Sequence, residues 1–249
     1  MNKTCVFCGS RVNSNEDVWP KWLLKLLRTS ANEKVPIKTR WFQQPPKEWL
    51  TADSALKVKN VCSECNNGWM SQLESEAKPV LSPMILGGAV TLTATQQQKI
   101  AAWFTKCAMV FDSMGKGEIF YDALDRHHLR NTSDPVLDST RIWLGMYSEP
   151  NGIRASENHR TLMKTNLSRR PIKIHVFTMS IGHLVLQLTS LKMVHIEDLP
   201  ESTLSTKGPP MIEALVLIWP ANLQGVQWPP SISFNDTDRR LTILAYRFG

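Results

Sequence analysis

Two cysteine pairs frame the part of the chain that decides its fold: Cys5-Val6-Phe7-Cys8-Gly9, and Cys62-Ser63-Glu64-Cys65, which runs directly into Asn66-Asn67-Gly68-Trp69-Met70. A Cys-x-x-Cys turn directs two thiolates at one point, about 2.3 Å from a shared zinc ion. Two such turns complete a tetrahedral site, and Gly9 supplies the permissive backbone that such turns favour after their second ligand. We therefore expect Cys5, Cys8, Cys62 and Cys65 to hold one structural Zn²⁺ ion.

The other interpretations of these cysteines are weaker. No apolar leader precedes the first pair, so we expect a cytoplasmic protein, and disulfides are rare in the reducing cytosol. A redox dithiol explains one pair but not two. A closed site of four cysteines has no open position for a substrate, so it indicates stability rather than activity. The fifth cysteine, Cys107, is expected to be a small buried residue of an apolar helix face.

An acidic stretch follows the first pair, in Ser14-Asn15-Glu16-Asp17-Val18-Trp19-Pro20. The zinc site should bring this stretch close to the residues that follow Cys65. Glu16 and Asp17 offer carboxylate oxygens, and Asn66 or Asn67 offers an amide carbonyl. Such oxygen ligands suit Mg²⁺ or Mn²⁺ better than zinc.

These motifs, taken together, resemble a group of bacterial and phage HNH endonuclease-like proteins, which belong to the His-Me finger, or ββα-metal, nucleases. The segment Cys-x-x-Cys-Asn is also similar to the phage recombination endonuclease VII family. The likeness covers residues 1–85, and weaker likeness continues at 182–185 and 228–230. It implies two strands and a helix around one catalytic Mg²⁺ or Mn²⁺ ion, and cleavage of DNA phosphodiester bonds. The implied metal ligands are Glu16 and Asn66, with Asn67 as the competitor of Asn66.

The resemblance places the general base of the reaction at Asp17, where the family has histidine. A base that activates water works best with a pKa near 7, and the ordinary pKa is about 6.5 for histidine but about 3.9 for aspartate. Aspartate is also shorter than histidine. If Asp17 simply replaces the base, we expect a loss of about two to four decades in rate.

Three interpretations of Asp17 stay open. The chain is a natural relative that binds but hardly cuts, or the residue was changed to trap a complex, or another histidine serves as the base. The histidines available for that role are His127, His128, His159, His175, His183 and His195, each of which is an ordinary surface or core residue in the simpler interpretation.

The patterns of the whole chain predict an α+β protein in two parts. Residues 1–85 are expected to form the ββα-metal domain, and residues 86–249 a second domain with helices at about 95–130 and mostly antiparallel strands at about 140–249. We expect helices at 18–28, at 66–78 and at 95–114, and a strand at 56–61. Pro79 should end the second helix, and Thr95–Gln98 should form a capping box for the third.

The last third of the chain has the patterns of strands. We expect strands at 140–147 and at 172–179, a turn at Gly182 that pairs residues 183–189 back as a hairpin, and a further strand at 215–219. The polar segment 148–170 is expected to be a long basic loop.

Composition permits a nucleic-acid partner and excludes a membrane span. The formal net charge is +7 and the sequence pI about 9.2. We expect DNA as the partner, contacted by Lys21, Lys25 and Arg28 on the first helix and by Arg169 and Arg170 in the basic loop. A homodimer or a partner protein is left open. The alternative function is a catalytically dead module that binds nucleic acid or protein on a zinc scaffold.

Overall fold

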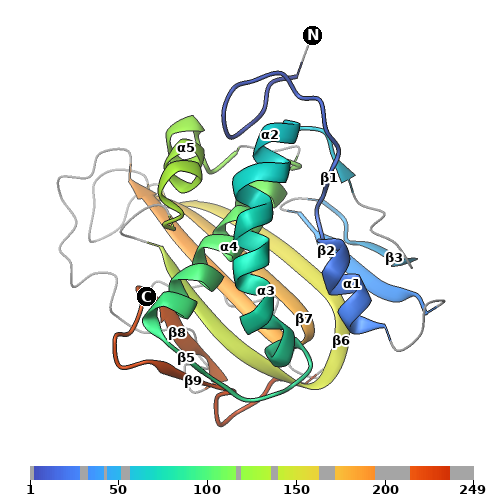
Figure 1. Ribbon diagram of the computed structural model, residues 1–249, viewed down its shortest axis with the longest axis vertical. Helices are drawn as coiled ribbons and strands as arrows, with labels where there is room; N and C mark the ends of the chain where they lie inside the picture. Colours follow the sequence, from blue (N-terminus) through green and yellow to red (C-terminus); the bar gives the residue numbers. More distant parts are fainter. Residues whose placement is uncertain are drawn as a thin grey trace.

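The computed structural model describes residues 3–28, 33–41, 44–51, 57–115, 119–135, 140–162, 172–193 and 214–235. This part of the chain has an α+β fold, as the sequence predicts, with α3 and α4 lying across a mainly antiparallel sheet (Figure 1). The helices are α1 (Lys21–Leu27), α2 (Ser63–Cys65), the π-turn η1 (Asn66–Met70), α3 (Ser71–Ile85), α4 (Ala94–Asp112) and α5 (Ala123–Thr132). The strands are β1 (Glu16–Asp17), β2 (Val35–Arg40), β3 (Lys47–Thr51), β4 (Lys57–Val58), β5 (Val90–Leu92), β6 (Arg141–Leu162), β7 (Ile172–Met193), β8 (Val216–Trp219) and β9 (Val226–Trp228).

Two strands of 22 residues, β6 and β7, form the centre of the main sheet. They pair antiparallel from Arg141 opposite Thr189 to Leu162 opposite Ile172. On the other side of β6, β8 pairs with its first part and β2 with its later part, and β3 extends β2. The pairs β1–β4 and β5–β9 form two small antiparallel sheets. Among the described strands only β2 and β6 run parallel, so the predicted antiparallel character of the C-terminal part is confirmed.

Glycine residues bend the two long strands where their pairing register shifts. The shift lies between Met146 and Ile153 on β6, opposite Gly182 on β7. Gly182 has a φ of 55°, and a Cβ atom there would overlap the carbonyl oxygen of Ile85. The predicted turn at Gly182 is therefore wrong: this glycine bends one continuous strand, and residues 172–179 and 183–189 both belong to β7.

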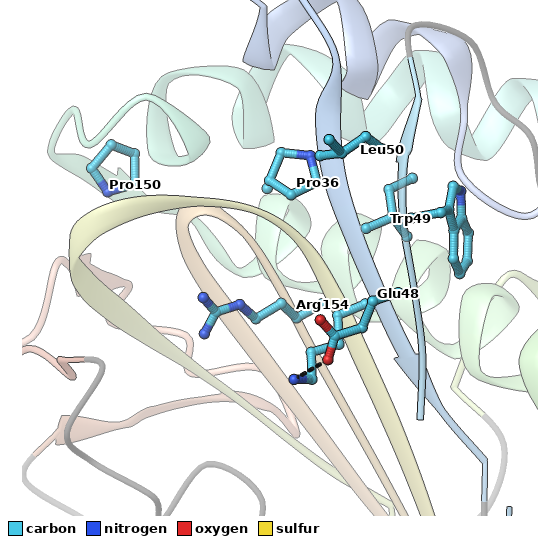
Figure 2. Close-up of a pocket in the computed structure, with 9 residues that line it drawn as sticks. Pro36, Glu48, Trp49, Leu50, Pro150 and Arg154 are labelled. Carbon is cyan, nitrogen blue, oxygen red and sulfur yellow. Dashed lines mark ion pairs between the residues drawn. The ribbon is translucent and has the colours of Figure 1, made fainter. Parts of the chain in front are cut away.

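A groove of about 710 Å³ lies where β2 and β3 meet the bend of β6 (Figure 2). Apolar side chains line part of it, among them Pro36, Trp49 and Leu50. Lys38 forms an ion pair with Glu48 in its wall. The groove therefore combines apolar surface with charged groups of both signs.

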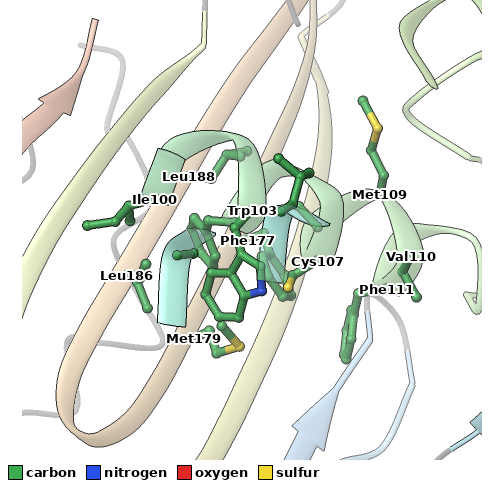
Figure 3. Close-up of a cluster of buried hydrophobic side chains, with 14 of the residues drawn as sticks. Ile100, Trp103, Cys107, Met109, Val110, Phe111, Phe177, Met179, Leu186 and Leu188 are labelled. Atoms are coloured by element: carbon green, nitrogen blue, oxygen red, sulfur yellow. The ribbon is translucent and has the colours of Figure 1, made fainter. Parts of the chain in front are cut away.

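Helix α4 is the centre of the hydrophobic core. Every residue from Ile100 to Asp112 is buried. Figure 3 shows Trp103 beside Phe177 and Met179 of β7. The rings of Phe111 and Phe177 lie 5.2 Å apart. On its other side Phe111 stacks on Trp41, with ring centroids 4.6 Å apart. Burying one such side chain contributes roughly 1.5–3 kcal/mol, so α4 holds the helical layer on the sheet.

Two predicted helix boundaries are wrong. Helix α3 does not end at Pro79 but continues to Ile85 and contains Pro83 as well. Both proline residues are exposed, so the backbone groups that lose their helical partner face solvent. The capping box of α4 lies two residues earlier than predicted, because the Thr93 hydroxyl accepts from the amide of Gln96 and the Gln96 side chain accepts from the amide of Thr93.

The predicted loop at 148–170 is also wrong in its described part, since β6 extends to Leu162. Its polar residues belong to a strand because they alternate between the two faces, with Glu157 buried and Asn158 exposed. The division into domains 1–85 and 86–249 stays a prediction. The hydrophobic core is continuous across that boundary, because β2 pairs with β6 and α3 packs on α4.

The bend of β6 gives a stability prediction. A Cβ atom on Gly152 would overlap the carbonyl oxygen of Pro36 on the paired strand. We expect Gly152→Ala to lower the free energy of unfolding by about 2–3 kcal/mol, as overpacking against a fixed backbone does. Asn158→Ala, on the exposed face of the same strand, should change it by less than about 0.5 kcal/mol. Urea unfolding of both variants measures the difference, and equal effects would contradict a tight contact at Gly152.

Candidate functional site

The four paired cysteines meet at one point. Their sulfur atoms all lie within 4.8 Å of one another, and the Sγ atoms of Cys8 and Cys62 are 3.5 Å apart. In a tetrahedral site with bonds of about 2.3 Å, neighbouring sulfur atoms are about 3.8 Å apart. All five cysteines of the chain are free thiols in this structure, and Cys107 is buried in α4 as predicted. The predicted cluster is thus confirmed, and it could hold a metal ion such as zinc.

The backbone around the cluster prepares its sulfur atoms for a cation. The amide of Cys65 donates to the Sγ atom of Cys62, an arrangement that stabilises negative charge on sulfur. Burial raises the pKa of Cys8, but hydrogen bonds from the side chain and backbone of Ser10 outweigh this effect and lower it to about 6. Burial raises the pKa of Cys62 and of Cys65. A bound cation would favour the thiolate form of all four groups.

Contacts around the cysteines fasten the first pair to the second. The amide of Val6 donates to the carbonyl oxygen of Asn60 at 2.9 Å, and the amide of Ser63 donates to the Asn13 side chain at 2.7 Å. The ring of Phe7 meets the ring of Trp69 edge to face, with centroids 5.0 Å apart. The N-terminal segment therefore packs on the start of the helix that follows the second pair.

The acidic stretch forms β1, which pairs antiparallel with β4. Glu16 lies opposite Val58, and Asp17 lies opposite Lys57. Strand β4 leads into the second cysteine pair and then into α2, η1 and α3. The paired strands β1 and β4 and the helix after the second cysteine pair thus form one unit with the cysteine cluster, although α1, β2 and β3 lie between β1 and β4 in the chain.

Glu16 points into the protein, toward helices α3 and α4. It is buried, and the nearby charges that act on it are those of Lys106, Glu74 and Asp17. The ammonium of Lys106, itself buried, lies 2.8 Å from a carboxylate oxygen of Glu74. Burial raises the pKa of Glu16 to about 7, although Lys106 opposes the rise. Although burial acts against the charged form of Lys106, the neighbouring groups, Cys107 among them, keep its pKa raised.

The predicted general base and the other predicted ligands lie nearer the surface. Asp17 is partly exposed, and its Oδ1 atom lies 3.9 Å from the ammonium of Lys57 but has no hydrogen-bond donor. Asn66 is partly buried in the first turn of η1, and Asn67 is exposed. No hydrogen bond or ion pair in the described part of the chain joins Glu16 to Asn66 or Asn67. The assignment of Glu16, Asp17 and Asn66 as catalytic residues stays a prediction.

The predicted DNA contacts are only partly within the described residues. Lys21 and Lys25 are exposed on α1, and Arg28 is partly buried just beyond that helix. Arg169 and Arg170 lie outside the described residues. No helix among the described residues is long and apolar enough to cross a membrane.

The six histidines have different surroundings. His127 and His128 are exposed on α5, His183 has its Nδ1 atom 2.8 Å from the carbonyl oxygen of Tyr147, and His195 lies outside the described residues. His159 and His175 lie together with Asp112 and Glu157. Sequence reasoning named both residues only as possible bases and missed the group that they form. The signal was Glu157-Asn158-His159, an acid and an imidazole two residues apart on one strand face.

Comparisons with models of protein families, with curated proteins and with solved structures found no match to this chain.

The burial of Glu16 predicts how stability depends on pH. Its pKa is about 7 in the folded chain and 4.5 as a reference value, so ionisation costs the folded state free energy as the pH rises through this window. The chain is therefore more stable at a pH below this window, where Glu16 is protonated, than at a pH above it, where Glu16 is ionised. We expect Glu16→Gln to gain stability over the wild type between pH 5 and pH 8, by at most roughly 3 kcal/mol. Urea unfolding without added magnesium or manganese measures this gain.

The control is Glu64→Gln, since Glu64 is exposed and makes only a long ion pair with Arg130 at 3.7 Å. Its stability should follow the wild type at every pH. If Glu16→Gln also follows the wild type at every pH, Glu16 is not a buried acid.

Proposed function

We propose that the chain is an HNH-type, metal-dependent DNA endonuclease of the His-Me finger lineage, in which Asp17 weakens catalysis. The observation that carries this proposal is that β1 pairs with β4, which leads into α2–α3, and that the four cysteines join the segment before β1 to the start of this helix. It agrees with the ββα arrangement implied by the sequence motifs of residues 1–85. Glu16 and Asp17 are on the first strand of this unit, and Asn66 is in the first turn after the second cysteine pair.

The four cysteines act in this proposal as a structural zinc site. They supply only sulfur, which suits zinc, and they leave no position for a substrate. Their contribution is to hold the segment before β1 against α2 and η1. The chemistry must then come from the acidic strand beside this scaffold.

The residues of the acidic strand fit a hard divalent cation. Glu16 and Asn66, with Asn67 as the competitor of Asn66, offer carboxylate and amide oxygen atoms, the ligand type preferred by Mg²⁺ and Mn²⁺. The Oδ1 atom of Asp17 is buried without a hydrogen-bond donor, so it can accept one from a water molecule. When bound, such an ion supplies a Lewis acid that polarises the scissile phosphate and stabilises the leaving oxygen.

The protein side chains then have separate tasks. Asp17 accepts a proton from the attacking water, but weakly, because a carboxylate is a weaker base than an imidazole. The charge of Lys106, which is itself paired with Glu74, attracts Glu16 from inside the protein. The exposed Lys21 and Lys25 on α1 contact the phosphates of the DNA.

A second candidate function is a binding module that does not cut, and one observation favours it. Glu16 is buried beside Lys106, whose ammonium already provides the counter-charge that a metal ion would supply. In that case the zinc scaffold positions α1 and the groove between β3 and the bend of β6 for a partner. The two candidates differ in whether an imidazole at position 17 restores cleavage.

Replacing Asp17 tests this difference. We expect Asp17→His to cut plasmid DNA with magnesium or manganese at least about a hundredfold faster than the wild type, because it supplies a base with a pKa near 7. Asp17→Asn, which removes the carboxylate without adding an imidazole, should be no faster than the wild type. Rates of supercoil loss measure the effect.

The other outcomes of this assay are also informative. Equal cleavage by all three forms would show that another residue is the base. If no form cuts duplex, branched or single-stranded DNA, fluorescence anisotropy with the same substrates decides whether the chain binds without cutting. Absence of both cleavage and binding contradicts both candidate functions.

The zinc assignment gives a separate prediction. We expect Cys62→Ser to lose one equivalent of zinc per chain and to lower the melting temperature, because metal binding at such a site is coupled to folding. Cys107→Ala removes a buried cysteine outside the cluster and should keep its zinc. Elemental analysis of the purified proteins measures the metal, and unchanged zinc in Cys62→Ser would contradict the assignment.

A further inference from the structure

A second group of metal-ligating side chains lies away from the cysteines. We name it the Asp-Glu-His-His cluster; it consists of Asp112, Glu157, His159 and His175. Asp112 is the last residue of α4. Glu157 and His159 lie two residues apart on β6, and His175 is directly opposite His159 on β7. Side chains from α4, β6 and β7 therefore meet at one point on the helix-covered side of the sheet.

The four side chains aim one atom each at a common centre. The Nε2 atom of His175 lies 3.0 Å from Oε1 of Glu157, and the Nε2 atom of His159 lies 3.4 Å from the same oxygen. The distance from Nε2 of His159 to Oδ1 of Asp112 is 3.6 Å, and all four atoms lie within 4.8 Å of one another. In a tetrahedral zinc site with bonds of about 2.0–2.1 Å, the ligand atoms are about 3.3 Å apart. The observed spacing is close to that value.

Outer hydrogen bonds hold the ligands in this orientation. The Nδ1 atom of His175 lies 3.2 Å from the hydroxyl of Tyr121, which lies 3.3 Å from the hydroxyl of Ser190. The second carboxylate oxygen of Asp112 accepts from the guanidinium of Arg126 at 2.8 Å. Metal ligands in proteins are usually fixed in this way, with the far atom of each imidazole or carboxylate bonded to a polar partner.

The cluster is buried, so each of its charges needs a partner of opposite charge. The side chains of Asp112 and His175 are 0% exposed, that of Glu157 is 2% exposed, and that of His159 is 17% exposed. Arg126 neutralises one of the two carboxylates from outside the cluster. Lys192 on β7 is already paired with Asp122 and Asp125. The imidazoles of His159 and His175 lie within 3.4 Å of Glu157, so a buried carboxylate faces two nitrogen atoms that can coordinate a metal.

We propose that the Asp-Glu-His-His cluster is a second metal site, which binds one divalent transition-metal ion such as zinc. Two imidazole nitrogen atoms and two carboxylate oxygen atoms form a mixed set that such ions accept, while Mg²⁺ and Ca²⁺ prefer oxygen alone. Four protein ligands leave no open position, so the ion is structural and fastens the end of α4 to β6 and β7. This site does not depend on the nuclease proposal.

Metal content tests the proposal without any activity assay. Chain purified with zinc present should contain two equivalents, one on the cysteines and one on the Asp-Glu-His-His cluster. His159→Ala removes the most accessible ligand and should leave one equivalent. His128→Ala, at an exposed position of α5, is the matched control and should keep two. Tyr121→Phe removes only an outer partner and should weaken the second ion roughly 10–100-fold.

Cobalt substitution identifies which site each ion occupies. Co²⁺ on the cysteines gives sulfur-to-metal charge-transfer bands, whereas Co²⁺ on nitrogen and oxygen atoms gives ligand-field bands without them. We expect both sets in the wild type and only the sulfur set in His159→Ala. A wild type with one equivalent and sulfur bands alone would overturn the proposal, and the cluster would then be a hydrogen-bonded ion network. This wild-type measurement decides the matter even if His159→Ala does not fold.

Discussion

The buried charges of α4 are the constraint on which both candidate sites depend. This helix is buried from Ile100 to Asp112, yet it carries Lys106 and Asp112 in that stretch. A charge inside a protein must be paired, because its desolvation costs several kcal/mol. Glu74 pairs with Lys106 and Arg126 pairs with Asp112, both at 2.8 Å. The partners of these two charges fix where α3 and α5 pack, and hence where the acidic strand and the Asp-Glu-His-His cluster form.

Pairing of this kind specifies geometry more than it adds stability. A buried ion pair recovers little beyond the cost of removing its two charges from water, but loss of one partner leaves the other uncompensated. The charge of Lys106 therefore attracts the carboxylate of Glu16, and this attraction limits how freely Glu16 can act as a metal ligand. The apolar core contributes most of the free energy of folding, and these pairs select one arrangement of its helices.

Structural features that depend on a short stretch of sequence could be predicted. Features that depend on the packing of elements far apart in the chain could not. The cysteine spacing was enough to predict their cluster, and the apolar stripe of α4 was enough to predict its burial. Pro79 and Gly182 were misinterpreted because each residue ends an element in some settings and bends it in others. An exposed proline leaves α3 intact, and a strand pair as long as β6–β7 continues past a glycine. The Asp-Glu-His-His cluster was not predicted, because its residues come together only through the pairing register of β6 with β7 and the position of α4.

The cysteine cluster and the Asp-Glu-His-His cluster are linked through one side chain. The guanidinium of Arg126 bonds to Asp112 and lies over the ring of Phe7, 5.8 Å from its centroid. Phe7 lies between Cys5 and Cys8 in the sequence, so the position of the first cysteine pair determines where the ring that contacts Arg126 lies. Residues that share a partner in this way do not contribute independently to stability. A metal ion on the cysteines would therefore also support Arg126, Asp112 and the strand pair behind them, because Cys5 and Phe7 of the N-terminal segment belong to the hydrophobic core.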